Sequence, residues 1–243
     1  MFEVACLLGV ENKVVGLGEI SGKDIYPIEK SKNIPKVGNA FRPSIEKIIA
    51  LTPDLVVANE GINFPTKEFA QHGINVVEFS TRRIEDIFSN IEKFGKLVGK
   101  EKEAQEVIVS SRKKLENIKK IANNNLKGVF IYSTSPLMVF TDKSLPGDIL
   151  EVLGVKNIGE NLSGGKPVIN PELILKENPD FIVGIMSVDS VETLKKSIPL
   201  VEHTNAGKNN NIFIFDAELI YRNSPRMLEG IEILSERLNK IIK

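Results

Sequence analysis

Ser44-Ile-Glu-Lys-Ile-Ile-Ala-Leu-Thr-Pro-Asp-Leu-Val-Val57 and Asn170-Pro-Glu-Leu-Ile-Leu-Lys-Glu-Asn-Pro-Asp-Phe-Ile-Val183 follow one pattern. Their glutamates, Pro-Asp pairs and final valines share a single offset, because 172 − 46, 180 − 54 and 183 − 57 all equal 126. In each copy the spacing predicts a helix that ends before the proline, a turn at the aspartate and a short buried strand. The duplication therefore predicts two similar lobes.

Length and composition are those of an ordinary globular protein. The chain has 243 residues, 42% of them apolar, and its 32 basic and 32 acidic side chains cancel. A balanced charge provides no overall field that would recruit nucleic acid or an anionic membrane. No apolar run approaches the length of a membrane span, and Glu3 stands where a signal peptide needs positive charge.

Metal-binding and disulfide motifs are not expected from the cysteine and histidine content. Cys6 is the only cysteine, so neither an internal disulfide nor a cysteine cluster can form. His72 and His203 lie far apart along the chain and are interpreted as lone surface histidines. No hydrolase, phosphate-loop or zinc-protease motif is present in the sequence, which disfavours an enzyme.

Hydrophobic periodicity predicts an α/β protein with two lobes, each a parallel-type sheet flanked by helices, joined by one long α-helix. The long helix is expected over residues 101–123, where glycine and proline are absent and apolar residues recur at helical spacing. We expect an N-terminal lobe over 1–100, a linking helix over 101–124 and a C-terminal lobe over 125–243. The expected strands are Val14–Leu17, Leu55–Ala58, Asn75–Phe79, Val129–Ser133, Phe181–Gly184 and Ile212–Phe215; the other expected helices are Phe2–Leu8, Ser44–Ala50, Thr66–His72, Ile84–Leu97, Gly147–Leu153, Pro171–Glu177, Val191–Lys196 and Pro225–Ile242.

Polar and basic side chains gather in the loops that follow the predicted strands. Ligands of parallel α/β sheets bind beyond the carboxyl ends of the strands, so these loops are expected to line a cleft between the lobes. Cationic groups there favour an anionic ligand, and tyrosine rings offer a stacking surface. The residues concerned are Tyr26, Arg42, Asn59, Arg82, Arg83, Thr141, Lys143, Lys166, Asp216, Tyr221 and Arg222.

A set of short motifs along nearly the whole chain resembles one known family. They are Gly9–Gly16, Ile34–Gly38, Pro43–Glu46 with Leu51–Val57, Gly73–Val77, Gly147–Leu150 with Leu153–Ile158, and Asn178–Asp180. In this order they resemble the solute-binding proteins of ABC importers for ferric siderophores, haem and vitamin B12. The resemblance implies two α/β lobes joined by one long helix, a ligand held between the lobes, no catalysis and no resident cofactor.

The resemblance also implies roles for particular residues. An acidic residue on each lobe would contact the permease: Glu172 in the C-terminal lobe, and Glu60 or Glu68 in the N-terminal lobe, where the register position itself is Asn63. Ligand contacts are implied for Arg222, Asp216 and Tyr26. Asn59 and Lys166 stand at positions where vitamin B12 binders stack the corrin on tryptophan.

The chain has no tryptophan, and this favours an anionic ferric chelate such as a siderophore over vitamin B12. Vitamin B12 remains an alternative, as does haem bound through Tyr26, Tyr132 or Tyr221. An enzyme on a related two-lobed scaffold is a further alternative, with only Asp216 and Glu60 available as acid or base. The expected partners are an ABC permease with its ATPase, and the expected location is extracytoplasmic. Relative to the family, we expect the first strand and an export signal to be absent from this sequence, which favours a late start of the sequence over the alternative of an N-terminal sheet edge open to pairing with another chain.

Overall fold

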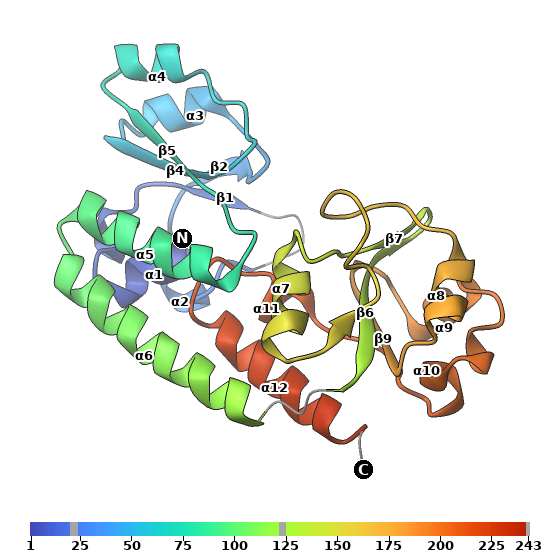
Figure 1. Ribbon diagram of the computed structural model, residues 1–243. Coiled ribbons are helices and arrows are strands. Elements are labelled where there is room, and N and C mark those ends of the chain that lie inside the picture. Colours follow the sequence, from blue (N-terminus) through green and yellow to red (C-terminus); the bar gives the residue numbers. More distant parts are fainter. Residues whose placement is uncertain (20–23, 122–124, 242–243) are drawn as a thin grey trace. The chain divides into compact units, whose positions relative to one another are not determined.

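The structure, a computed structural model, describes residues 1–19, 24–121 and 125–241 (Figure 1). Its chain divides into two compact units. Unit 1 consists of Met1–Ser80 and Asp86–Val109, and unit 2 consists of Thr81–Glu85 and Ser110–Lys243. Neither unit is one continuous stretch of chain, since the short segment Thr81–Glu85 belongs to unit 2. The division also falls within the longest helix, α6 (Glu101–Ile121), which continues from unit 1 into unit 2.

Unit 1 combines small sheets with flanking helices. Strands pair in the orders β1-β2-β3 and β4-β5, and the β4–β5 pair is parallel. Ile48 of α3 and Phe69 of α4 pack into one core with Ala58 of β4. Besides the start of α6, the unit contains α1 (Phe2–Leu7), β1 (Leu17–Glu19), α2 (Ile28–Ser31), β2 (Lys36–Asn39), β3 (Arg42–Pro43), α3 (Ile45–Ala50), β4 (Leu55–Asn59), α4 (Thr66–Gln71), β5 (Asn75–Phe79) and most of α5 (Ile84–Val98).

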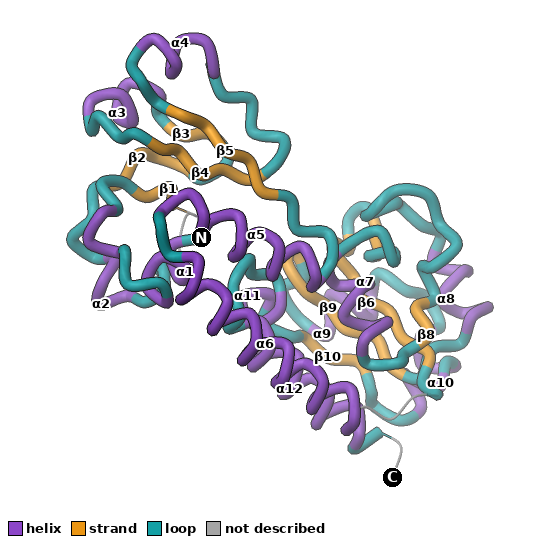
Figure 2. Tube along the Cα trace, turned by 60° about the vertical axis from the view of Figure 1, so that its left-hand side comes forward, coloured by secondary structure: helices purple, strands orange, loops and turns teal. Residues whose placement is uncertain are grey.

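Unit 2 is built on a larger sheet of order β10-β9-β6-β7, with β8 also paired to β6. The β6–β9 and β9–β10 pairs are parallel, and Figure 2 shows these three strands side by side in orange. The elements are β6 (Lys127–Thr134), β7 (Leu137–Val139), α7 (Leu145–Val152), β8 (Lys156–Asn157), α8 (Pro171–Glu177), β9 (Phe181–Ser187), α9 (Val191–Lys196), α10 (Asn205–Lys208), β10 (Ile212–Ile214), α11 (Ala217–Ile220) and α12 (Met227–Asn239).

Both faces of this sheet are covered, because alternate residues of a strand point to opposite faces. Ile131 of β6 and Ile182 of β9 pack with Ile174 of α8 and Leu194 of α9. Helices α7 and α12 lie on the other side of β6 and β9 (Figure 1). Burial on both faces explains why β9 reads as a continuous apolar run, and it leaves the strand ends as the places where this sheet can meet a ligand.

The duplicated segment has the same backbone course in both copies. Helices α3 and α8 begin at positions 45 and 171, and strands β4 and β9 begin at 55 and 181, so the offset of 126 (171 − 45 and 181 − 55) persists. The residue before each proline has a positive φ, 47° at Thr52 and 48° at Asn178. The expected exit from the right-handed helical region before proline is therefore observed, and in both copies the chain enters the left-handed region.

The predicted fold class is confirmed as mixed α/β with parallel sheets flanked by helices, but some boundaries were wrong. The strand expected over Val14–Leu17 begins only at Leu17. The reason lies in its partner strand β2, which starts at Lys36 because Pro35 has no N–H to donate. The first hydrogen bond between the two segments runs from the amide of Leu17 to the Pro35 carbonyl, at 2.9 Å. The expected helix ends at Asn123 and Ile242 lie outside the described residues, and the last helix starts at Met227 rather than Pro225.

Candidate functional site

An aromatic cluster with a cation on its edge stands in unit 2. The rings of Tyr132 and Phe140 meet edge to face with centroids 5.5 Å apart, and Phe140 and Tyr221 are 6.1 Å apart in a tilted arrangement. Tyr132, Phe140 and Tyr221 are called the tyrosine cluster below. The ammonium nitrogen of Lys166 lies 4.4 Å from the Tyr132 ring centroid, within the range of a cation–π interaction. Lys166 and Tyr221, which the sequence analysis named as candidate ligand-binding residues, are thus linked through the rings of Tyr132 and Phe140.

The elements that position the cluster come from distant parts of unit 2. Tyr132 lies in the carboxyl half of β6, Phe140 follows β7, and Tyr221 ends α11. The amide of Phe140 donates to the Phe130 carbonyl at 2.9 Å, which extends the β6–β7 pairing by one residue. Tyr221 remains 41% exposed and Tyr132 is half-buried, so the cluster still presents ring surface to solvent.

Thr141, which is fully buried, fixes the two loops that carry the candidate lysines. Its amide donates to the Gly165 carbonyl at 3.1 Å, and its hydroxyl donates to the Gly164 carbonyl at 2.6 Å. The same hydroxyl oxygen accepts from the amide of Lys143 at 3.2 Å. Lys143 and Lys166 are therefore anchored through one side chain, while both remain exposed.

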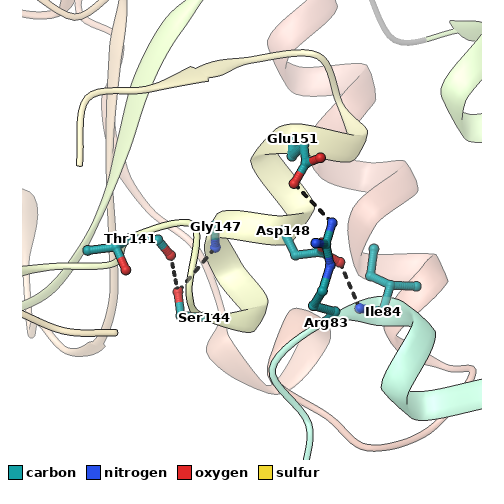
Figure 3. Close-up of polar contacts among 7 residues, drawn as sticks. All are labelled: Arg83, Ile84, Thr141, Ser144, Gly147, Asp148 and Glu151. Atoms are coloured by element: carbon teal, nitrogen blue, oxygen red, sulfur yellow. Dashed lines mark hydrogen bonds and ion pairs between the residues drawn. The ribbon is translucent and has the colours of Figure 1, made fainter. Parts of the chain in front are cut away.

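Figure 3 shows how the next turn of chain supports this loop. The Ser144 hydroxyl donates to the Thr141 carbonyl at 2.6 Å and caps α7 by accepting from the Gly147 amide at 3.4 Å. A Cβ atom at Gly147 would lie 2.1 Å from the Thr141 carbonyl oxygen, so only glycine fits this close approach. The loop before α7 is thus fixed at both ends.

Asp148 on α7 is buried and holds the segment that leads into α5 (Figure 3). Its carboxylate accepts from the amide of Ile84 at 2.7 Å and pairs with Nε of Arg83 at 2.7 Å. The Arg83 guanidinium also reaches Glu151 at 3.1 Å. The sequence had placed Arg83 among the loop residues of the expected cleft, but these contacts explain it as a structural anchor.

Arg222 and Asp216 take local roles around α11. Asp216 caps this helix, with its carboxylate accepting from the Glu218 amide at 2.9 Å. The Arg222 guanidinium donates to the Glu218 carbonyl at 2.6 Å and to the Glu218 carboxylate at 2.5 Å. Glu218 therefore offsets the charge that was expected to face an anionic ligand. The i,i+4 spacing of Glu218 and Arg222 is the sequence signal that could have indicated this pair.

Burial changes the acid–base chemistry of Tyr221. Desolvation, with a smaller contribution from Tyr132, raises the pKa of the Tyr221 phenol above its ordinary value of 10.0. An ordinary tyrosine phenol is already neutral at physiological pH, and the raised pKa keeps Tyr221 in this form, in which it can donate a hydrogen bond to an acceptor on a ligand.

The candidate ligand residues of unit 1 come from three different elements. Tyr26 precedes α2 and is 43% exposed, with a cis peptide bond to Pro27. Arg42 is exposed in β3 opposite Asn39. Asn59 is the exposed last residue of β4, and its carbonyl accepts from the Ile62 amide at 3.4 Å. Their contribution to ligand binding stays a prediction.

The candidate docking acids are all exposed. Glu172 stands in the first turn of α8, where its amide donates at 3.0 Å to the Asn170 side chain that caps the helix. Glu68 lies in the first turn of α4, and Glu60 follows β4 with its amide donating to Phe79 at 3.0 Å. Exposure leaves each carboxylate accessible to another protein, and the choice between Glu60 and Glu68 is still open.

Neither a candidate metal centre nor a membrane-spanning helix is present among the described residues. Within residues 1–19, 24–121 and 125–241, histidine, cysteine and carboxylate side chains nowhere gather in the number that a metal ion needs. No helix in that part of the chain combines the length and apolar character needed to cross a bilayer.

A comparison with known proteins assigns the family. The periplasmic binding protein family profile matches residues 1–219. The chain is 31% identical to an uncharacterized ABC transporter substrate-binding lipoprotein, YvrC of Bacillus subtilis, over 97% of this chain and 76% of the relative. It is 28% identical to a vitamin B12-binding protein of Vibrio campbellii, over 98% and 86% of the two chains.

The fold agrees with that assignment. A crystal structure of a possible iron-binding (periplasmic solute-binding) protein from Staphylococcus epidermidis superposes with a TM-score of 0.85 at 23% identity, covering 98% of this chain and 94% of the other. The match of one family profile to most of the chain is the decisive observation. The chain belongs to the periplasmic binding protein family, whose members bind solutes for transport and are not enzymes.

Proposed function

We propose that this chain is the substrate-binding component of an ABC importer and that its ligand is a ferric siderophore or a similar metal chelate. In this role it works outside the cytoplasm and delivers the chelate to a membrane permease driven by an ATPase. Family membership and the names of the relatives support the transport role. The choice of ligand rests on this chain's own residues.

The observation that carries the ligand proposal is the tyrosine cluster with Lys166 on its edge. Aromatic rings provide contact area for the organic shell of a chelate, and a nearby ammonium group favours a negatively charged one. Lys143, held on the same buried Thr141, adds a second exposed cation to this part of unit 2. Arg222 contributes less than the sequence suggested, because Glu218 already neutralises it.

On unit 1 we propose Tyr26, Arg42 and Asn59 as further ligand contacts. All three are exposed, and they offer a phenol, a guanidinium and an amide, which are donors that a chelate rich in oxygen atoms can use. Glu172, with Glu60 or Glu68, is proposed to contact the permease. Exposed carboxylates of this kind can pair with cationic side chains of a partner and fix its orientation.

Haem and vitamin B12 are the alternative ligands, and one titration distinguishes them from siderophores. The chain has three tyrosines and no tryptophan, and each tyrosine is either a proposed ligand contact of unit 1 or a member of the tyrosine cluster of unit 2. Tyrosine emission therefore comes from these residues alone. The purified protein is titrated with ferrichrome, ferric enterobactin, haemin and cyanocobalamin, with free tyrosine correcting for light absorbed by each ligand.

Lys166→Met and Lys208→Met are the matched variants for this titration, because both lysines are exposed in unit 2 and only Lys166 touches the tyrosine cluster. We expect an anionic ferric chelate to bind, with affinity falling about fivefold to tenfold in Lys166→Met, roughly 1 kcal/mol. Lys208→Met should bind as the unmodified protein does. Absence of binding by all four ligands would refute the proposed function, and preference for neutral cyanocobalamin would overturn the ligand class.

A further inference from the structure

The carboxyl end of β9 contains a residue with an unusual backbone. Met186 has φ 62°, in the left-handed region that residues other than glycine, asparagine and aspartate rarely occupy. It is also 46% exposed, although the preceding strand residues from Phe181 to Ile185 are buried. A large apolar side chain is thus held in a strained conformation and turned toward solvent.

The strain coincides with an irregularity in the sheet. In the β6–β9 ladder, Ile131 stands opposite Gly184 and Ser133 stands opposite Ser187. Two residues of β9, Ile185 and Met186, therefore face the single residue Tyr132 on β6. Such bulges re-aim side chains and gather next to binding sites.

The position along the strand matters because ligands of parallel sheets bind at the carboxyl ends. Met186 is the last residue but one of β9, and the strand opposite it contributes Tyr132, whose ring lies below the Lys166 ammonium. Backbone strain that persists at a ligand-binding edge is frequently part of the binding site. Burial does not explain Met186, since nearly half of its surface is exposed.

We infer that Met186 is a ligand-contacting residue that sets which chelates fit against the tyrosine cluster. This inference rests on the proposed function and adds a residue that the loop pattern of the sequence did not indicate. The thioether is flexible and polarizable, so it packs against the hydrocarbon part of a chelate while Lys166 takes the charge. The bulge holds this side chain at the strand end before the ligand arrives.

Leu200 provides a matched control in the same unit. It too has a positive φ, 64°, and an exposed apolar side chain, 57% exposed. It lies after α9 on the way to α10, where the Ala206 amide donates to Pro179 just before β9, at the amino edge of the sheet. Substitution by glycine removes the strain and the side chain at both positions, but only position 186 lies at the carboxyl edge.

The test compares Met186→Gly with Leu200→Gly, using whichever of ferrichrome, ferric enterobactin, haemin and cyanocobalamin binds the unmodified protein most tightly. We expect Met186→Gly to bind that ligand at least fivefold more weakly and to change the order of affinities among the four. Leu200→Gly should stay within twofold. Both variants should melt no earlier than the unmodified protein, because glycine relieves the left-handed backbone.

A second measurement needs no substitution. Hydrogen peroxide transfers one oxygen atom to a methionine sulfur and leaves water, and mass spectrometry follows each methionine in its own tryptic peptide. Met186 should oxidise faster than Met227, which is 1% exposed, and a saturating ligand should slow only Met186.

The outcomes separate the inference from the function on which it rests. If a ligand binds but Met186→Gly has unchanged affinity and oxidation is not slowed, the inference is wrong and the function stands. If none of the four ligands binds the unmodified protein, the proposed function fails and the inference falls with it.

Discussion

The two copies of the duplicated unit, α3–β4 and α8–β9, share a backbone but differ in what their side chains hold. Both begin at a capped helix, both turn through a left-handed residue before proline, and both end in a strand of a parallel pair. In the first copy the turn contacts the start of β5, the strand paired with β4. In the second copy the turn joins elements that are far apart in the chain.

Asp54 and Asp180 illustrate this difference. At Asp54 the backbone carbonyl accepts from the Asn75 amide at 2.9 Å, as part of the β4–β5 pairing. The Asp180 carboxylate accepts from the Lys127 amide at 2.8 Å and from the Asn205 side chain at 3.0 Å. One aspartate therefore ends a helix–strand turn, and the other also fixes the start of β6 and of α10. The repeat therefore preserves backbone geometry more strictly than it preserves side-chain contacts.

The largest expected effect is a loss of folding stability when the aspartate of the second copy is replaced. Asp180→Ala should lower the free energy of unfolding by about 2 kcal/mol, because it leaves a backbone amide and a side-chain amide without their acceptor. Asp54→Ala, an exposed position, should cost less than about 0.5 kcal/mol. Urea unfolding of both variants measures the difference. Equal losses would show that the two turns are equivalent after all.

The glutamates test function rather than stability. If Glu172 contacts the permease, Glu172→Ala should weaken the apparent affinity of the binding protein for the reconstituted transporter about tenfold, or roughly 1.4 kcal/mol. Glu46→Ala at the equivalent position should change it less than about twofold. Both apparent affinities are obtained by measuring the ATPase activity of the transporter as the concentration of binding protein is raised. The ligand affinity of each variant is the control. An equal loss in Glu46→Ala would remove the functional distinction between the copies.

The left-handed residues should respond with opposite signs. Thr52→Gly should stabilise the protein by about 0.5 kcal/mol, because relief of a strained β-branched residue exceeds the entropy cost of glycine. Asn178→Gly should destabilise it by about 1 kcal/mol, since the Asn178 side chain accepts from the Asn205 amide at 2.7 Å. Thermal unfolding measured side by side decides, and a shift in the same direction for both would contradict this account.

The smallest effect concerns acid stability at Glu46. Its own backbone amide and, second, the Ser44 hydroxyl at 2.9 Å lower the pKa of the Glu46 carboxyl below its ordinary value of 4.5. The sign follows from linkage: the stabilisation is present above the unfolded pKa and is lost as pH falls through the folded one. Carbon-detected NMR titration should find this pKa below 4.5, and higher in Ser44→Ala. An unchanged pKa in that variant would exclude the hydroxyl as a cause.

Elements with a strong local signal were predicted well from the sequence. The helices Pro171–Glu177 and Val191–Lys196 and the strand Asn75–Phe79 have the predicted bounds, since caps, prolines and apolar runs mark them locally. The short strands β7 and β8 were missed, because two or three residues become a strand only through pairing with β6. The expected lobe boundaries, 1–100, 101–124 and 125–243, stay a prediction, and the two compact units described above are drawn differently.

The candidate site was also predicted only in part, because local sequence signals do not show which distant residues come into contact. The rule that ligands bind beyond strand ends selected Lys166 and Tyr221, which the structure brings to one aromatic cluster. It could not indicate Phe140, since an apolar residue in a sequence looks like core. It also treated Arg222 as a free cation, because it considered loop residues one by one and did not use the i,i+4 spacing of Arg222 from Glu218 of α11.

The contact between Ile84 and Asp148 has a consequence for synthesis on the ribosome. The amide at the start of α5 receives its cap from a carboxylate 64 positions later in the chain. While residues 1–100 leave the ribosome, that amide must therefore bond to water or to a chaperone. The start of α5 belongs to unit 2 and can reach its final state only after α7 has been made, although the rest of α5 belongs to unit 1 and is synthesised earlier.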